Sequence, residues 1–81
     1  MFHKVKDVRA MPGYRLHVEF ISGEIREYDI TPLFDIWEPF NALKDVGLFE
    51  RVKTDTGGYG ISWNDEIDLS CEELYAGGRA H

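Results

Sequence analysis

The 81-residue chain has little basic charge, one cysteine and no long apolar run. Nine Lys and Arg stand against fifteen Asp and Glu, so the net charge of −6 would repel the phosphates of a nucleic acid unless the cations cluster. No run approaches the roughly 20 apolar residues that span a bilayer, and residues 1–4 open no secretory signal. A single cysteine excludes an internal disulfide. We therefore expect a cytoplasmic protein with no membrane segment and no direct nucleic-acid partner.

The chain does contain enough apolar material for one domain. Hydrophobic residues make up 43% of it and aromatic residues 14%, which is ordinary for a globular protein and too much for a disordered one. Its length allows a single domain, 1–81, near the lower limit for independent folding. No linker, repeat or low-complexity tract divides the chain.

Three strands are predicted in the N-terminal part. Charges interrupt the apolar pattern of Lys4–Ala10, which is typical of an edge strand. Met11–Gly13 combines proline and glycine as a turn does. Residues 15–20 alternate between polar and apolar side chains, as a half-buried strand requires.

The loop after Phe20 allows two registers for the third strand. A two-residue loop, Ser22–Gly23, would place Phe20 opposite Ile25 and would turn two unpaired carboxylates into the core, at a cost of several kcal/mol each. A three-residue loop, 21–23, with its glycine left-handed, pairs Phe20 with Glu24 and keeps those carboxylates outside. We predict the three-residue loop.

Short helices and a hairpin are predicted next. Thr31 suits the N-cap of a helix with proline at its first position, and Pro39 ends that helix. A second helical turn begins at Asp45. Strands at Arg51–Asp55 and Tyr59–Trp63 are joined by a Thr-Gly-Gly turn.

The C-terminal part predicts a helix over Cys71–Ala76. Ser70 and Glu73 form a capping box, the acidic run Asp65–Asp68 suits a helix N-terminus, and Gly77–Gly78 suits a left-handed helix end. The order βββ-α-ββ-α predicts a two-layer α+β fold. In it an antiparallel sheet of about five strands is covered on one face by short helical turns and the C-terminal helix.

Several short segments recur in the same order in one group of small bacterial domains. The chain resembles the domain-of-unknown-function family DUF2442 from about Val5 to Tyr75. The segments that carry the resemblance are Phe20 with Gly23, Asp29–Leu33, Leu43–Asp45, Leu48–Phe49 with Val52, and Ile61–Leu69 with Leu74–Tyr75.

The resemblance implies a fold but no activity, because the family has none established. Some of its members occur alone, and others occur beside a second small uncharacterised domain in a toxin–antitoxin-like pairing. Others again are fused to a helix-turn-helix DNA-binding domain. This chain has no helix-turn-helix segment, so a DNA-binding role does not carry over. The family often has proline where Cys71 stands, at a first helical position that tolerates it.

Candidate chemical groups are isolated in the sequence. Cys71 at a helix start could be a nucleophile, but the two glutamates that follow raise a thiol pKa, and an inert thiol is favoured. His17 and Glu19 point the same way on one strand, yet two ligands make a poor metal site. His3 and His81 are expected at mobile chain ends.

Two further patterns have simpler explanations. Asp65, Glu66 and Asp68 could bind a hard cation, but they lack the glycine and distal glutamate of an EF-hand loop. Gly57–Gly60 lacks the lysine and the Ser or Thr of a phosphate-binding loop, so a hairpin is favoured. We assign no catalytic residue, metal ligand or cofactor.

The aromatic residues offer a better candidate surface. One short helix with a single buried face cannot hide Phe34, Trp37 and Phe40 together, so at least one of Trp37 and Phe40 should be exposed. Such a side chain beside acidic residues is typical of an interface anchor. The strand edges at Lys4–Ala10 or Arg51–Asp55 offer a second route, by strand addition.

We therefore expect a non-enzymatic protein-binding domain, in an antitoxin-like role, with Trp37 and Phe40 as the anchors. Its charge would steer it to a basic protein surface. A small-ligand-binding or regulatory domain is the alternative, and an enzyme of unknown class ranks last. The sequence indicates neither the partner's identity nor an oligomeric state.

Overall fold

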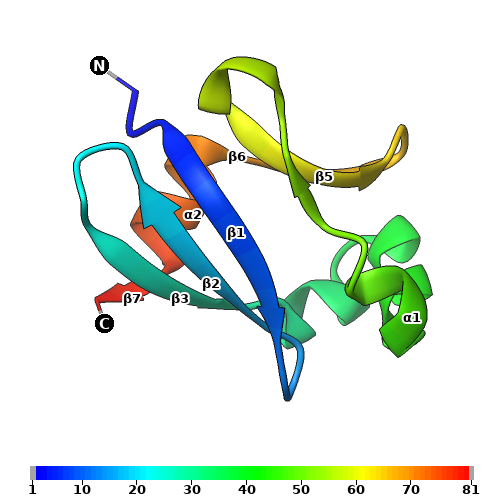
Figure 1. The fold of residues 1–81 in the computed structure, drawn as a ribbon. Helices are drawn as coiled ribbons and strands as arrows, with labels where there is room; N and C mark the ends of the chain where they lie inside the picture. The colour runs from blue at the N-terminus through cyan, green and yellow to red at the C-terminus, as the bar shows by residue number, and fades with distance from the viewer. Residues whose placement is uncertain (1, 81) are drawn as a thin grey trace.

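The computed structural model describes residues 2–80, and it contains two antiparallel sheets (Figure 1). Met1 and His81 lie outside the described residues. The first sheet has the order β1-β2-β3-β7 and the second has the order β4-β5-β6. The strands are β1 (Val5–Met11), β2 (Arg15–Phe20), β3 (Ile25–Asp29), β4 (Lys53–Thr54), β5 (Gly60–Asn64), β6 (Ile67–Ser70) and β7 (Arg79–Ala80).

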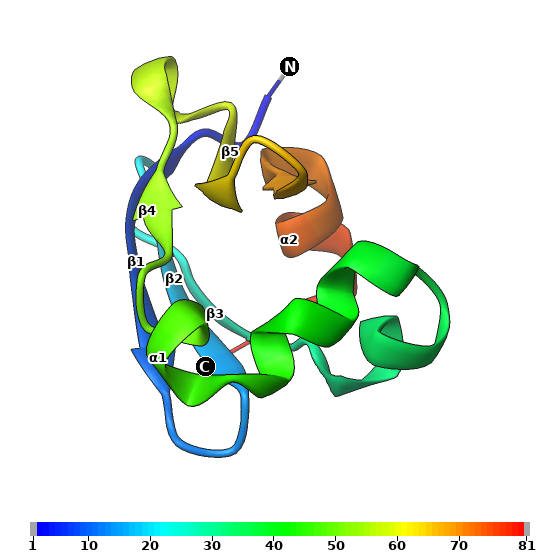
Figure 2. The ribbon, with the colours of Figure 1, turned by 90° about the vertical axis from the view of Figure 1, so that its right-hand side faces the viewer.

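Short helices connect and cover the sheets. Figure 2 shows β1, β2 and β3 on one side of the molecule and α2 on the other, with β5 and the helices between β3 and β4 closing the two ends. Eighteen apolar residues in the space between them form one core. The helices are the 3-10 segments η1 (Thr31–Asp35), η2 (Glu38–Lys44) and η3 (Thr56–Gly58), and the α-helices α1 (Val46–Phe49) and α2 (Cys71–Gly77).

The predicted α+β class and the predicted hairpin register are confirmed. The Phe20 N–H donates to the Glu24 carbonyl at 2.9 Å, and Gly23 is left-handed with a φ of 95°. Tyr28 and Ile30 are therefore buried beside the alternating apolar residues of β2. The burial of one face of the hairpin selects this register, because a slip by one residue would turn the same side chains to solvent.

Two strands were not predicted, and the second sheet is separate from the first. β6 occupies part of the acidic segment that we had assigned to a helix N-terminus, and its Ile67 and Leu69 are buried while Asp68 and Ser70 are exposed. β7 pairs with β3 through two exposed residues. Strand β4 is shorter than the expected Arg51–Asp55.

The helix ends differ from the predictions in detail. The Ser70 hydroxyl does accept the Glu73 N–H at 3.1 Å, so the N-cap of α2 is confirmed. Thr31 is not an N-cap: it lies inside η1, and its N–H and hydroxyl both donate to Asp29. The left-handed end expected at Gly77–Gly78 is wrong, because Gly78 is extended with a φ of −82°.

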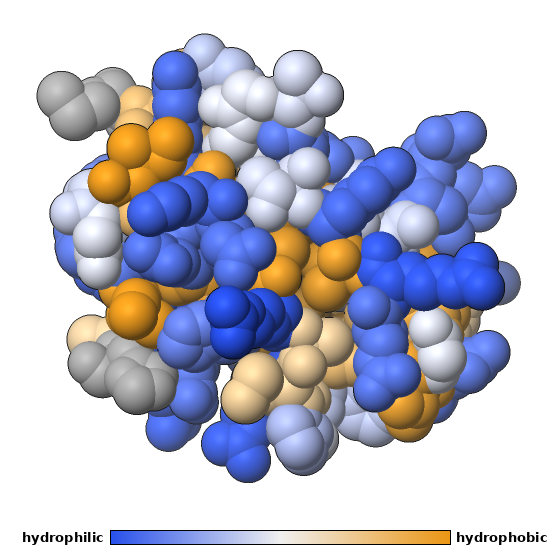
Figure 3. Space-filling view, in the orientation of Figure 1, coloured by the Kyte–Doolittle hydropathy of each residue, from blue (hydrophilic) through white to orange (hydrophobic). Residues whose placement is uncertain are grey.

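The outer edge of β1 lies against the η3 turn. β1 and β4 are outer strands of their sheets, as predicted. Gly58 approaches β1 so closely that a Cβ atom there would lie 2.6 Å from the Val5 carbonyl oxygen. Hydrophilic residues cover most of the face seen in Figure 3, and hydrophobic residues show only in separate patches between them.

Candidate functional site

The chain bends outward between η1 and η2 and exposes two large apolar side chains. Trp37 is extended, with φ −125° and ψ 115°, and it separates the two 3-10 segments. Pro39, in the first turn of η2, has no N–H with which to continue the hydrogen bonds of η1. Ile36 is 63% exposed and Trp37 is 48% exposed. The break in the predicted helix therefore produces the exposed aromatic residue that the sequence required.

These side chains form one wall of an open groove of about 620 Å³. The opposite wall is β6 and the first turn of α2, which contribute Asp68, Leu69, Ser70 and Glu73. We call this feature the acidic groove. Its lining residues are Ile36, Trp37, Glu38, Pro39, Phe40, Glu66, Asp68, Leu69, Ser70 and Glu73.

The two predicted anchors have different positions in the acidic groove. Trp37 is accessible, whereas Phe40 is buried at 4% exposure. Their ring centroids are 5.6 Å apart, and the Phe40 ring also lies 6.1 Å from that of Trp63 in the core. Trp37 can therefore contact a partner directly, while Phe40 supports it from below.

Four carboxylates surround the apolar wall and no Lys or Arg lines the groove. Glu38, Glu66 and Asp68 are exposed, and Glu73 accepts a hydrogen bond of 2.9 Å from the Tyr28 hydroxyl. Burial, followed by this hydrogen bond and the Glu73 charge, raises the pKa of Tyr28 above its ordinary value. The acidic groove is therefore suited to a ligand with both apolar and cationic groups.

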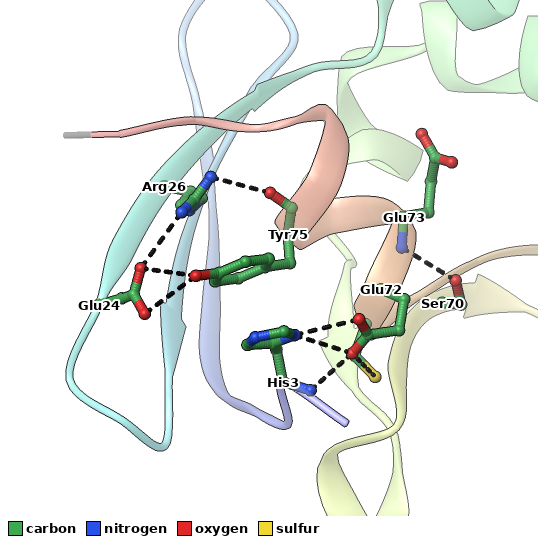
Figure 4. A network of polar contacts seen from close by, with 8 residues as sticks. His3, Glu24, Arg26, Ser70, Glu72, Glu73 and Tyr75 are labelled. Carbon is green, nitrogen blue, oxygen red and sulfur yellow. Dashed lines mark hydrogen bonds and ion pairs between the residues drawn. The ribbon is translucent and has the colours of Figure 1, made fainter. Parts of the chain in front are cut away.

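A second cluster joins the N-terminal segment to α2, as Figure 4 shows. The His3 backbone N–H donates to Glu72 at 2.6 Å, and the His3 ring stacks on Tyr75 with a centroid separation of 3.6 Å. Arg26 lies 3.9 Å from the other face of Tyr75 and donates to the Tyr75 carbonyl at 3.0 Å. The structure thus places His3 against α2, and no local signal could reveal a contact across 69 residues.

Most other candidate residues are explained by the fold. The Cys71 thiol is buried, and burial together with the Glu72 charge raises its pKa, which disfavours a thiolate. Asp65 and Glu66 form the turn between β5 and β6, where the Asn64 side chain accepts the Glu66 N–H at 2.8 Å. Gly57 and Gly58 belong to the turn before β5.

Metal-binding geometry is also absent from the described residues. Glu19 lies beside His17 on β2 and forms an ion pair of 3.7 Å with Lys6. Within residues 2–80 no three His, Cys, Asp or Glu side chains are grouped to hold a metal ion. None of the helices in this part of the chain has the length and apolarity needed to cross a membrane.

Many of the cations are neutralised locally by carboxylates. Lys6, Arg9, Arg15 and Arg26 form ion pairs of 3.2 to 3.9 Å. Carboxylates therefore offset part of the basic charge on the sheet that these residues share.

Comparison with known proteins gives a family and a fold. The model of the family described as "Protein of unknown function (DUF2442)" matches residues 5–80. A crystal structure of a Nitrosomonas europaea protein, described as a putative DNA-binding protein, matches with a TM-score of 0.79 and 25% identity. The match covers 91% of the present chain and 47% of that chain, so this domain spans about half the length of its structural relative. No curated protein matches the chain.

Proposed function

The chain belongs to the DUF2442 family, whose function is unknown, and we propose that it is a non-enzymatic domain that binds a basic protein through its acidic groove. One observation carries this proposal: the exposed Ile36 and Trp37 lie beside four carboxylates with no lysine or arginine between them. A solvent-exposed apolar pair has a cost that a partner would remove by covering it.

Charge supports a basic partner. The net charge of −6 and the carboxylates of the groove would steer a cationic surface to this face and would repel other acidic proteins. Tryptophan is also one of the residue types in which binding hot spots are enriched. In this proposal the domain is the partner-neutralising half of a cytoplasmic two-protein system.

Co-purification with the neighbouring gene product tests the proposal. Trp37→Ala should abolish it, whereas Ile21→Ala should leave it intact, since Ile21 is 65% exposed and lies outside the groove. The captured protein should be basic, and raised salt should weaken the complex. Equal capture by the two variants would remove Trp37 as the anchor.

DNA binding is the rival suggested by the description of the Nitrosomonas europaea protein. Against it stand the negative net charge and the ion pairs that occupy Lys6, Arg9, Arg15 and Arg26. Fluorescence anisotropy with a mixed-sequence duplex at low salt should show no saturable binding by this chain. Saturable binding would favour the rival.

A small-ligand role is the second candidate. The groove volume of about 620 Å³ lies in the range of small-molecule sites, and its carboxylates would select a cationic compound with an apolar body. A thermal-shift screen of aromatic amines and polyamines tests this role. A stabilising hit that disappears in Trp37→Ala would favour it over protein binding.

A further inference from the structure

The β6 strand has one side without a strand partner. It is the outer strand of the sheet β4-β5-β6, and no strand of residues 2–80 pairs with its other side. Unpaired strand edges present rows of backbone N–H and C=O groups to which an extended chain can add.

The ladder with β5 shows which backbone groups face that open side. The Cys71 N–H donates to the Tyr59 carbonyl at 2.8 Å, and the register pairs Ile61 with Leu69 two residues along. In an antiparallel ladder such hydrogen-bonded pairs alternate with pairs whose groups point outward. The N–H and C=O of Asp68, and the N–H of Ser70, therefore point away from β5.

A contact on the other side of β5 supports this assignment. The Asp55 N–H donates to the Gly60 carbonyl at 2.9 Å, so Gly60 directs its backbone toward β4 and away from β6. Gly60 is paired in register with Ser70. Both members of that pair thus point outward from the β5–β6 ladder, as the alternation requires.

β6 belongs to the wall of the acidic groove that faces Trp37. Asp68, Leu69 and Ser70 line the groove opposite Trp37. In a complete capping box the Glu73 carboxylate would accept the Ser70 N–H. Here Glu73 Oε2 accepts the Tyr28 hydroxyl at 2.9 Å, and within residues 2–80 the one hydrogen bond between Ser70 and Glu73 runs from the Glu73 N–H to the Ser70 hydroxyl, which leaves the Ser70 N–H available.

We propose that an extended basic segment of the partner adds to β6 as a fourth strand of this sheet. This inference rests on the proposed function and specifies how the groove binds. Alternate side chains of the segment would contact Ile36 and Trp37, while lysine or arginine at the other positions would meet Asp68, Glu66 and Glu38. The available backbone groups span Asp68 to Ser70, so the added strand would be only about three or four residues long.

A synthetic heptapeptide of alternating Lys and Val or Leu tests the backbone contacts without altering the protein. We would prepare it unmodified, with N-methyl groups on the odd-numbered amides, and with N-methyl groups on the even-numbered amides. Strand addition uses one edge of the peptide only, so one methylated form should bind at least about ten-fold more weakly and the other nearly as well as the parent. Equal binding of the two forms, or no binding of the parent, would overturn strand addition.

Variants at position 68 test the same contact from the protein side. Asp68→Ala and Asp68→Pro both remove the carboxylate, but only proline removes the outward N–H, and an outer strand tolerates proline there. We expect binding by Asp68→Ala to weaken a few-fold, and by Asp68→Pro about ten-fold further, with near-ultraviolet circular dichroism unchanged. If Asp68→Pro does not fold, the methylated peptides decide alone.

The two proposals fail in different ways. If partner capture depends on Trp37 but both methylated peptides bind alike, the protein-binding function stands and strand addition is wrong. If partner capture is also indifferent to Trp37→Ala, both proposals fail. If light scattering showed two copies of this chain associating, and the peptide separated them, β6 would instead be assigned to self-association and the proposal would be overturned.

Discussion

Replacement of Gly58 by alanine tests how the second sheet closes against the first. Gly58 has a φ of 77°, and an added Cβ would lie 2.6 Å from the Val5 carbonyl oxygen and 3.3 Å from the Val5 nitrogen. An L-residue in the left-handed region costs roughly 1–2 kcal/mol. Displacement of a backbone that cannot swing away adds about 1–3 kcal/mol, as other overpacking does.

Gly57 provides the matched control for this experiment. Its φ of 83° imposes the same backbone cost, but an added Cβ would approach only the Tyr59 ring, a half-exposed side chain that can shift more readily than backbone. Gly57→Ala should therefore lose about 1–2 kcal/mol, and Gly58→Ala about 2 kcal/mol more. For a domain of this size the difference corresponds to roughly 8–16 °C in Tm.

Thermal and urea unfolding of the two variants, followed by circular dichroism, measure this difference. The packing described for η3 on β1 requires that Gly58→Ala be clearly the less stable of the pair. Equal losses would mean that the backbone of β1 gives way at little cost, and that the two sheets are only loosely joined at this edge.

Three further predictions concern α2. Ser70→Ala removes the acceptor of the Glu73 N–H, so urea unfolding should show a loss of about 1 kcal/mol that Ser70→Asp largely restores. Leu74→Ala, at a fully buried site, should lose about 2–5 kcal/mol, against less than about 0.5 kcal/mol for Val46→Ala at a half-exposed site. The His3 backbone N–H, and then the His3 ring, lower the pKa of Glu72 from 4.5 in the folded protein. The ionised Glu72 therefore stabilises the fold above about pH 4.5, and this stabilisation disappears as the pH falls through the lower pKa that Glu72 has in the folded state. Glu72→Gln should therefore flatten the fall of Tm with pH below about 4.5; an unchanged slope would show that the contact with His3 does not stabilise the fold.

The sequence predicts best where one face of a segment is buried. Burial alone selected the pairing of Phe20 with Glu24, because the other register would bury carboxylates. The same period-two pattern was present in Ile67 and Leu69, which are buried. There the neighbouring acidic residues also suit a helix N-terminus, and this second pattern masks the alternation.

Contacts made by few or distant residues gave no usable pattern. β7 has two exposed residues, so neither face of it is distinguished from a loop. The need for an exposed aromatic residue did follow from the crowding of Phe34, Trp37 and Phe40 in one short segment. The opposite wall did not, because only the tertiary fold brings Asp68 of β6 to the groove that Trp37 lines.

The Tyr75 ring lies between two flat nitrogen-containing groups from two other segments of the chain. The His3 imidazole stacks on one face within 7° of parallel, and the Arg26 guanidinium lies over the other. A stacked aromatic ring shields the protons directly above it from an applied magnetic field. The imidazole protons of His3 should consequently resonate upfield of their free-peptide positions, and detachment of this segment from α2 would return them. The two carbon-bound ring protons of His3 would thus report, in the intact protein, whether the N-terminal segment is packed on α2.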